Sequence, residues 1–134
     1  PIVRIRDVCH KDFYMTLKGD TFSLSKNHTK RLLVANGNIK DSIDLFDVLK
    51  ISKIINRHPL WKAQIIQIYF KDNKDIELIP RVGDHVFLLG STENIEDKFE
   101  NLDLFYKSGI QQIGWKNYKS INLKYKDQIV CIKR

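Results

Sequence analysis

Most of this 134-residue chain consists of short segments in which apolar residues alternate with polar ones or form brief apolar runs. Alternation with a period of two is typical of half-buried β-strands, because successive side chains point to opposite faces of a sheet. Clusters of Gly, Asp and Asn separate these segments and mark turns. The pattern predicts strands at residues 2–5, 13–17, 21–24, 31–35, 63–70, 76–82, 86–89, 111–115, 120–125 and 128–132.

Two other segments have apolar residues at helical steps. The first is expected to begin at Asp41 or Ser42, whose side chains suit an N-terminal cap. It ends at the His58-Pro59 step, because proline disfavours helix in the residue before it. The apolar face of this predicted helix consists of Leu45, Phe46, Val48, Leu49, Ile51, Ile54 and Ile55.

The second helical segment follows Gly90 and stops at Gly109, and Ser91, Thr92 and Asn94 offer capping oxygens at its start. Its charged residues are expected to face water: Glu96, Asp97, Lys98, Glu100 and Asp103. Strands that outnumber helices in this way predict an α+β fold. We expect one domain over residues 1–134, with an antiparallel or mixed sheet of many strands and two main helices packed on it.

The chain is basic, with 23 Lys and Arg against 16 Asp and Glu and a formal charge of +7. Such a charge suits nucleic acid, an anionic membrane surface or an acidic protein partner. The lysines are scattered, and no aromatic-rich basic motif of an RNA-binding sheet is present, so the charge is interpreted mainly as a solvated surface. A nucleic-acid-binding domain remains an alternative, with affinity that falls steeply with salt.

The cysteines, Cys9 and Cys131, either form one disulfide or remain two buried thiols, and the sequence leaves both possibilities open. Strand-like residues flank Cys9 and its neighbour His10. Adjacent residues of a strand point to opposite faces, so the two are not expected to form a catalytic thiol–imidazole pair.

The four histidines lack metal-ligand spacing, and the glycines form no phosphate-binding loop, so neither a metal nor a cofactor is expected. Asp84 beside His85 offers an acid next to a base, but Gly83 and Asp84 more simply form a tight turn. A non-enzymatic domain is therefore the favoured interpretation. A basic hydrolase that uses His85 is the alternative from another functional class.

The two closing strands, 120–125 and 128–132, are expected to form a hairpin around Lys126-Asp127, with the final strand at a sheet edge. An edge strand presents unpaired N–H and C=O groups to solvent. Such an edge either accepts a strand from a partner or is protected by nearby charges, here Lys124, Lys126, Lys133 and Arg134.

Several segments, in their order and spacing, resemble the FtsQ (DivIB) family of bacterial cell-division proteins in its Bacteroidetes form. The resemblance covers nearly the whole chain. It lies in Pro1-Ile2-x-Arg4, the hairpin 19–24, the strand pair with Pro-Arg-Val-Gly-Asp-His that ends at Leu89-Gly90, Lys98-Phe99, Leu102-x-x-Phe-Tyr106, Ile121 to Tyr125 and the closing Gln-Ile-Val-Cys.

The resemblance implies a single-pass inner-membrane protein with a short cytoplasmic tail, one membrane helix, a small POTRA domain and a periplasmic β domain. This chain would be the β domain alone, without the upstream parts, at the division septum. Such a domain has no enzymatic activity. It binds the division proteins FtsB and FtsL, links early and late components of the divisome, and accepts a strand of FtsB along its closing strand.

Carried over position by position, the resemblance implies that the partner-facing residues are Lys124, Tyr125, Lys126, Asp127, Gln128, Ile129 and Cys131. Tyr125 would supply an apolar anchor and Lys124 electrostatic steering. Asp127 and Gln128 are larger than the residues typical of the family at these positions. Lys124 carries the expected charge without the bidentate geometry of an arginine.

Overall fold

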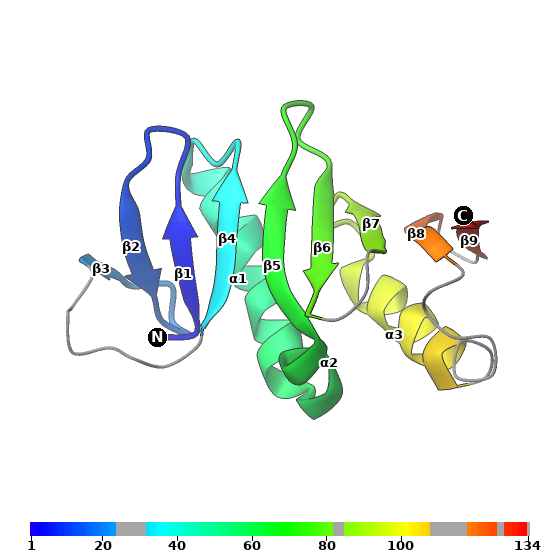
Figure 1. The fold of residues 1–134 in the computed structure, drawn as a ribbon. Coiled ribbons are helices and arrows are strands. Elements are labelled where there is room, and N and C mark those ends of the chain that lie inside the picture. The colour runs from blue at the N-terminus through cyan, green and yellow to red at the C-terminus, as the bar shows by residue number, and fades with distance from the viewer. Residues whose placement is uncertain (24–31, 82–84, 108–117, 126–127, 134) are drawn as a thin grey trace.

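The computed structural model describes residues 1–23, 32–81, 85–107, 118–125 and 128–133. Its strands form one nine-stranded sheet in the order β3-β2-β1-β4-β5-β6-β7-β8-β9 (Figure 1). The strands are β1 (Val3–Arg6), β2 (Asp12–Met15), β3 (Thr21–Ser23), β4 (Leu33–Gly37), β5 (Ile65–Phe70), β6 (Ile76–Pro80), β7 (Val86–Gly90), β8 (Tyr118–Tyr125) and β9 (Gln128–Lys133). The helices are α1 (Ser42–Arg57), α2 (Pro59–Gln64) and α3 (Ile95–Phe105).

The sheet is mixed, as expected. The pairs β1/β4, β4/β5 and β7/β8 are parallel, and the other neighbouring pairs are antiparallel. Parallel neighbours need a crossover connection, and helices supply two of them. The segment with α1 and α2 joins β4 to β5, and α3 follows β7 and precedes β8. The helices lie on one side of the sheet (Figure 1), so both predicted helices serve as the covers of a single core.

The core lies between the helices and the sheet face that they cover. Alternate strand residues on this face are buried, which is the period-two pattern of a one-sided sheet. Val3, Ile5, Ala35, Ile68, Phe70, Leu78, Phe87, Leu89, Ile121 and Leu123 pack there with Val48, Ile51, Ile55, Trp61, Phe99 and Leu102. The intervening residues, such as Arg4 and Tyr69, are exposed on the opposite face.

The predicted start and end of α1 are confirmed. The Asp41 side chain accepts a hydrogen bond from the Asp44 amide at 2.9 Å, and the helix ends at Arg57, before His58-Pro59. Asp44 also accepts from the Lys74 ammonium at 2.7 Å and from the Lys40 amide at 2.9 Å. Partial burial acts to raise the pKa of Asp44, but these hydrogen bonds and the Lys74 charge hold it below its ordinary value.

Several details of the predicted elements are wrong. Residues 59–64 form the short helix α2 with proline at its first position, whereas the sequence pattern predicted that the following strand starts at Ala63. Phe46 was assigned to the apolar face of α1 but is 57% exposed. Asn94 lies at the start of α3 in a left-handed conformation and makes no side-chain cap bond. Cys9 and His10 lie in the turn between β1 and β2, not in a strand. The predicted strand at 111–115 and the helix end at Gly109 fall outside the described residues.

Candidate partner-binding edge

The closing hairpin occupies one end of the sheet. β8 pairs in parallel with β7, with Phe87 opposite Ile121, and β9 pairs antiparallel with β8, with Ile121 opposite Cys131. Within the described part of the chain β9 has a neighbour on one side only, so it is an edge strand. The prediction that the last strand lies at an edge is confirmed. The edge at the other end is β3, which has only three residues.

The bulges of this hairpin lie on its inner strand. Between the pairs Asn122/Val130 and Tyr125/Gln128, β8 advances three residues while β9 advances two, so β8 carries one extra residue. A second shift lies between Tyr118 and Ser120. Bulges on an edge strand disturb the row of groups that another strand would recognise. Because both shifts insert residues in β8, the backbone of β9 keeps a regular repeat along its outer side.

The Lys124 side chain is directed back toward the sheet. Its ammonium lies 2.9 Å from an Asp75 carboxylate oxygen in the turn between β5 and β6, and the two side chains are 39% and 38% exposed. Its stem passes over Gly90, since a Cβ added to that glycine would lie 3.0 Å from Lys124 Cγ. The Lys124 amide donates to the Asn122 side chain at 2.9 Å within the bulge. Lys124 is therefore already ion-paired.

The other predicted partner-facing residues follow along the hairpin. Tyr125 ends β8, with its backbone opposite Gln128 at the start of β9. Ile129 and Cys131 lie farther along β9. Lys126 and Asp127, which connect the two strands, lie outside the described residues.

Helix α3 supports the hairpin from the covered face of the sheet. It packs against β8 and β9, and its buried Phe99 and Leu102 share the core with Ile121 and Leu123. These apolar contacts fix the position of β8, the strand to which β9 is bonded. The edge therefore belongs to the folded core and is not a loosely attached arm.

A buried lysine that the sequence pattern did not reveal holds the start of α3. Lys98 was expected to face water but is 4% exposed. Its ammonium donates to the carbonyls of Leu89 at 3.0 Å and Ser91 at 2.8 Å, which connects α3 to the end of β7. Burial lowers the pKa of Lys98, against the opposing attraction of Glu93 and Asp75. Its spacing in the sequence, three residues after Ile95 and four before Leu102, puts it on the apolar face of α3 despite its charge.

The strand order resolves the cysteine alternatives. Cys9 follows β1, and Cys131 lies in β9, six strand positions away (Figure 1). Strands in a sheet are about 4.8 Å apart, so this separation is about 29 Å. A disulfide requires Cα atoms within about 7 Å. The two cysteines therefore do not form a bridge within one chain. The alternative of two buried thiols is wrong for Cys9, which is a free, exposed thiol in the turn after β1.

The histidine considered for catalysis is enclosed. His85 is 1% exposed, and its ring packs edge to face against Phe87 with centroids 5.3 Å apart. Its predicted acidic neighbour Asp84 lies outside the described residues. Among the residues that the structure describes, no group of three or more His, Cys, Asp or Glu side chains is placed to hold a metal ion. No described helix is both long and apolar enough to cross a membrane.

Comparison with known proteins supplies the family. A search of curated proteins finds no match. The model of one family, described as FtsQ/DivIB, C-terminal related, matches residues 1–132, which is nearly the whole chain. The order of elements, the mixed sheet with its helices on one face and the closing edge hairpin agree with the resemblance found in the sequence. The chain therefore belongs to the FtsQ/DivIB C-terminal related family of cell-division scaffold proteins.

Proposed function

We propose that this domain is a non-enzymatic periplasmic scaffold of the divisome. It binds proteins of the FtsB and FtsL type through a strand added beside β9, and so links early and late division proteins at the septum. In the full protein it follows a cytoplasmic tail, one membrane helix and a POTRA domain. The observation that carries the proposal is the position of β9 at the end of the sheet.

Strand addition suits β9 for two physical reasons. The strand has six residues, which allows several main-chain hydrogen bonds to an incoming segment, and its outer side is not interrupted by a bulge. It is also held in place by β8 and by the core beneath α3. A preformed edge loses little conformational entropy when a partner binds, so more of the interaction energy appears as affinity.

Lys124 contributes to the choice of partner because its ammonium can leave the Asp75 carboxylate and pair with an acidic side chain of the partner. Its ion pair with Asp75 is more than one-third exposed on both sides, and pairs of this kind contribute only about 0–1 kcal/mol to stability. Breaking it therefore costs little when a partner brings its own acidic residue. The proposed partner segment is an extended strand with an acidic side chain near Lys124, which favours rapid association.

The Tyr125→Ala substitution tests the anchor. We expect this variant to bind the FtsB-type protein of the same organism about tenfold or more weakly, because a buried tyrosine at an interface centre contributes at least about 1–2 kcal/mol. The measurement is titration calorimetry with the purified domain. Tyr69→Ala is the matched control, since Tyr69 is an exposed tyrosine on β5, far along the sheet from β9.

Equal affinity for the wild-type domain and Tyr125→Ala, or an equal loss in Tyr69→Ala, would reject the proposed anchor. The circular dichroism and thermal unfolding of each variant show whether the domain remains folded.

A further inference from the structure

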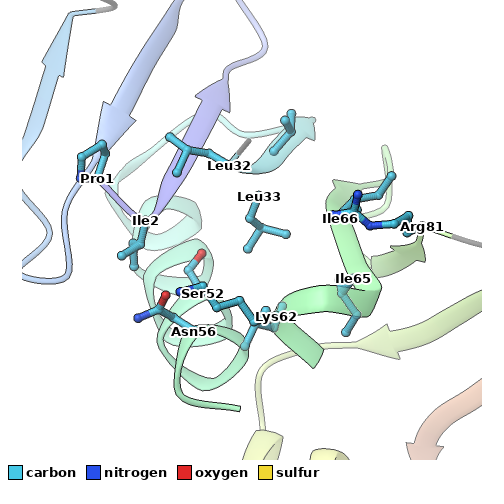
Figure 2. A pocket seen from close by; sticks show the side chains of 12 residues that line it. Pro1, Ile2, Leu32, Leu33, Ser52, Asn56, Lys62, Ile65, Ile66 and Arg81 are labelled. Carbon is cyan, nitrogen blue, oxygen red and sulfur yellow. The ribbon is translucent and has the colours of Figure 1, made fainter. Parts of the chain in front are cut away.

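A cavity lies between the helices and the sheet, well away from β9. It is bounded by the C-terminal half of α1, by α2, by the first residues of β4 and β5, by the two residues before β1 and by Arg81 after β6 (Figure 2). Its volume is about 580 Å³. Small-molecule sites in proteins are clefts of about 300–1,000 Å³, so this cavity has the size of a ligand site. β5, which lines the cavity, lies four positions from β9 in the strand order.

The cavity is opened by an irregularity in β5. Opposite β6, Ile65 pairs with Pro80 and Gln67 with Ile79, so Ile66 is an extra residue of β5 at this point. On the other side of β5, the ladder with β4 begins only at the pair Val34 and Gln67. Beside the cavity, before Val34 and Gln67, the backbones of β4 and β5 are therefore not paired with each other. Bulges occur often next to functional sites because they redirect the chain.

The chemistry of the lining is asymmetric. Apolar side chains form much of the wall: Ile2, Leu32, Leu33, Val34, Ile55, Ile65 and Ile66. Lys62 and Arg81 have the charged side chains of the lining, which contains no Asp or Glu. In Figure 2 the Lys62 side chain extends from α2 toward α1, and Arg81 lies beside Ile66 at the other lip. An occupant that complements this lining has an apolar body and a negative charge.

Ser52 supplies an independent sign of a ligand. It lies on α1 in the wall of the cavity and is 1% exposed, and its hydroxyl has no hydrogen-bond partner among the described residues. A buried hydroxyl without a partner is costly, and alanine would fill the same helical position without that cost. An oxygen atom of a bound ligand would satisfy this hydroxyl. The Asn56 side chain, one turn along α1, lines the same wall.

Arg81 is held at the rim by its own contacts. Its Nε donates to the Ala63 carbonyl at 3.1 Å, and its backbone amide donates to the Gln64 carbonyl at 2.6 Å. The guanidinium is thus fixed near the end of α2, where it adds positive potential at the opening of the cavity. Lys62 is an exposed residue of α2, and its side chain is directed toward α1 (Figure 2). The two cations therefore differ in role, with Lys62 closer to the polar wall of α1.

We propose that this cavity binds a small amphiphilic carboxylate. The apolar chain lies against the isoleucines and leucines of β4 and β5, and the carboxylate is bound by Lys62 with hydrogen bonds from Ser52 and Asn56. Arg81 attracts the anion from the rim. This site is separate from strand addition at β9 and does not depend on it.

The test is calorimetric titration of the 134-residue chain with decanoate below its micelle concentration. We expect one decanoate per chain. Decanol and decyltrimethylammonium should each bind at least about tenfold more weakly, because they lack the charge-assisted hydrogen bonds of the carboxylate. Lys62→Gln is expected to weaken decanoate binding about fivefold or more and Arg81→Gln to a smaller extent.

Two variants separate this site from general adsorption. Asn56→Phe places a large side chain in the cavity wall while it keeps both cations, and should abolish binding. Lys53→Gln removes the same type of charge from α1 at a position outside this lining, and should leave binding unchanged. The proposal is overturned if decanoate does not bind, if Asn56→Phe binds it normally, or if the cationic amphiphile binds as well as the carboxylate. Thermal unfolding confirms that each variant is folded.

Discussion

Proline is expected to abolish partner binding at one position of β9 and to lower stability at the next. The two variants compared are Ile129→Pro and Val130→Pro. Adjacent residues in a strand direct their N–H and C=O groups to opposite sides. One of these two residues therefore bonds to β8, and the other faces outward. Proline at the outward position removes the amide that a partner strand needs, and such a position tolerates proline because edge strands do.

We expect Ile129→Pro to be the variant that loses binding and stays folded. Its affinity for the FtsB-type partner should fall about 100-fold or more, because the lost bond leaves a partner carbonyl unpaired, at a cost of about 1–3 kcal/mol, and the proline ring obstructs the incoming strand. Val130→Pro should instead lower the thermal stability, because it removes a bond to β8. Titration calorimetry and thermal unfolding measure both effects. Two folded variants that both bind normally would show that the partner does not add a strand at β9.

The second large effect is expected at Gly37, at the end of β4 opposite Phe70 of β5. Gly37 has a φ of +99°, and a Cβ added there would lie 2.2 Å from the Phe70 carbonyl oxygen. That contact involves backbone on both sides, so it cannot be relieved by a side-chain rotation. Gly37→Ala should therefore destabilise the domain by about 3 kcal/mol or more, which lowers the unfolding midpoint by about 10 °C.

Gly19→Ala is the control for backbone strain alone. Gly19 has a similar φ of +88°, but its added Cβ would meet only the flexible end of Leu49 at 3.2 Å. Its expected cost is about 1 kcal/mol. Differential scanning calorimetry compares the two variants. Equal destabilisation would contradict the close approach of β4 and β5.

Local signals predicted the elements whose residues act mainly on their near neighbours. Asp41 and the His58-Pro59 step gave both ends of α1, since a cap and a proline act within a few residues. The same proline is the reason that α2 was not predicted. A proline marks the end of one helix, but it is also favoured at the first position of the next helix, as Pro59 is in α2.

Long-range pairing lay beyond the sequence pattern. The order of strands, with β1 beside β4 and β7 beside β8, depends on contacts between segments far apart in the chain. Lys98 was expected on the solvated face because it is charged, but its ammonium reaches carbonyls at the end of β7. A long side chain can bury its stem and satisfy its charge in ways that periodicity does not show.

The candidate edge was predictable in part. Two strand patterns separated by two polar residues predicted the hairpin of β8 and β9, and the pairing of β8 with β7 leaves β9 at the edge of the described sheet. The ion pair of Lys124 with Asp75 did not, because these residues are 49 positions apart. The cavity beside Ser52 was also hidden, since β4, β5 and α1 form it together.

Hydrogen–deuterium exchange at single-residue resolution tests strand addition most directly. Amide exchange in the domain is compared with and without the FtsB-type partner. If a partner strand adds beside β9, we expect strong new protection at alternate amides of residues 128–133 and little change in β3 at the opposite edge. Protection confined to another surface, with the β9 amides exchanging as in the free domain, would contradict strand addition at β9.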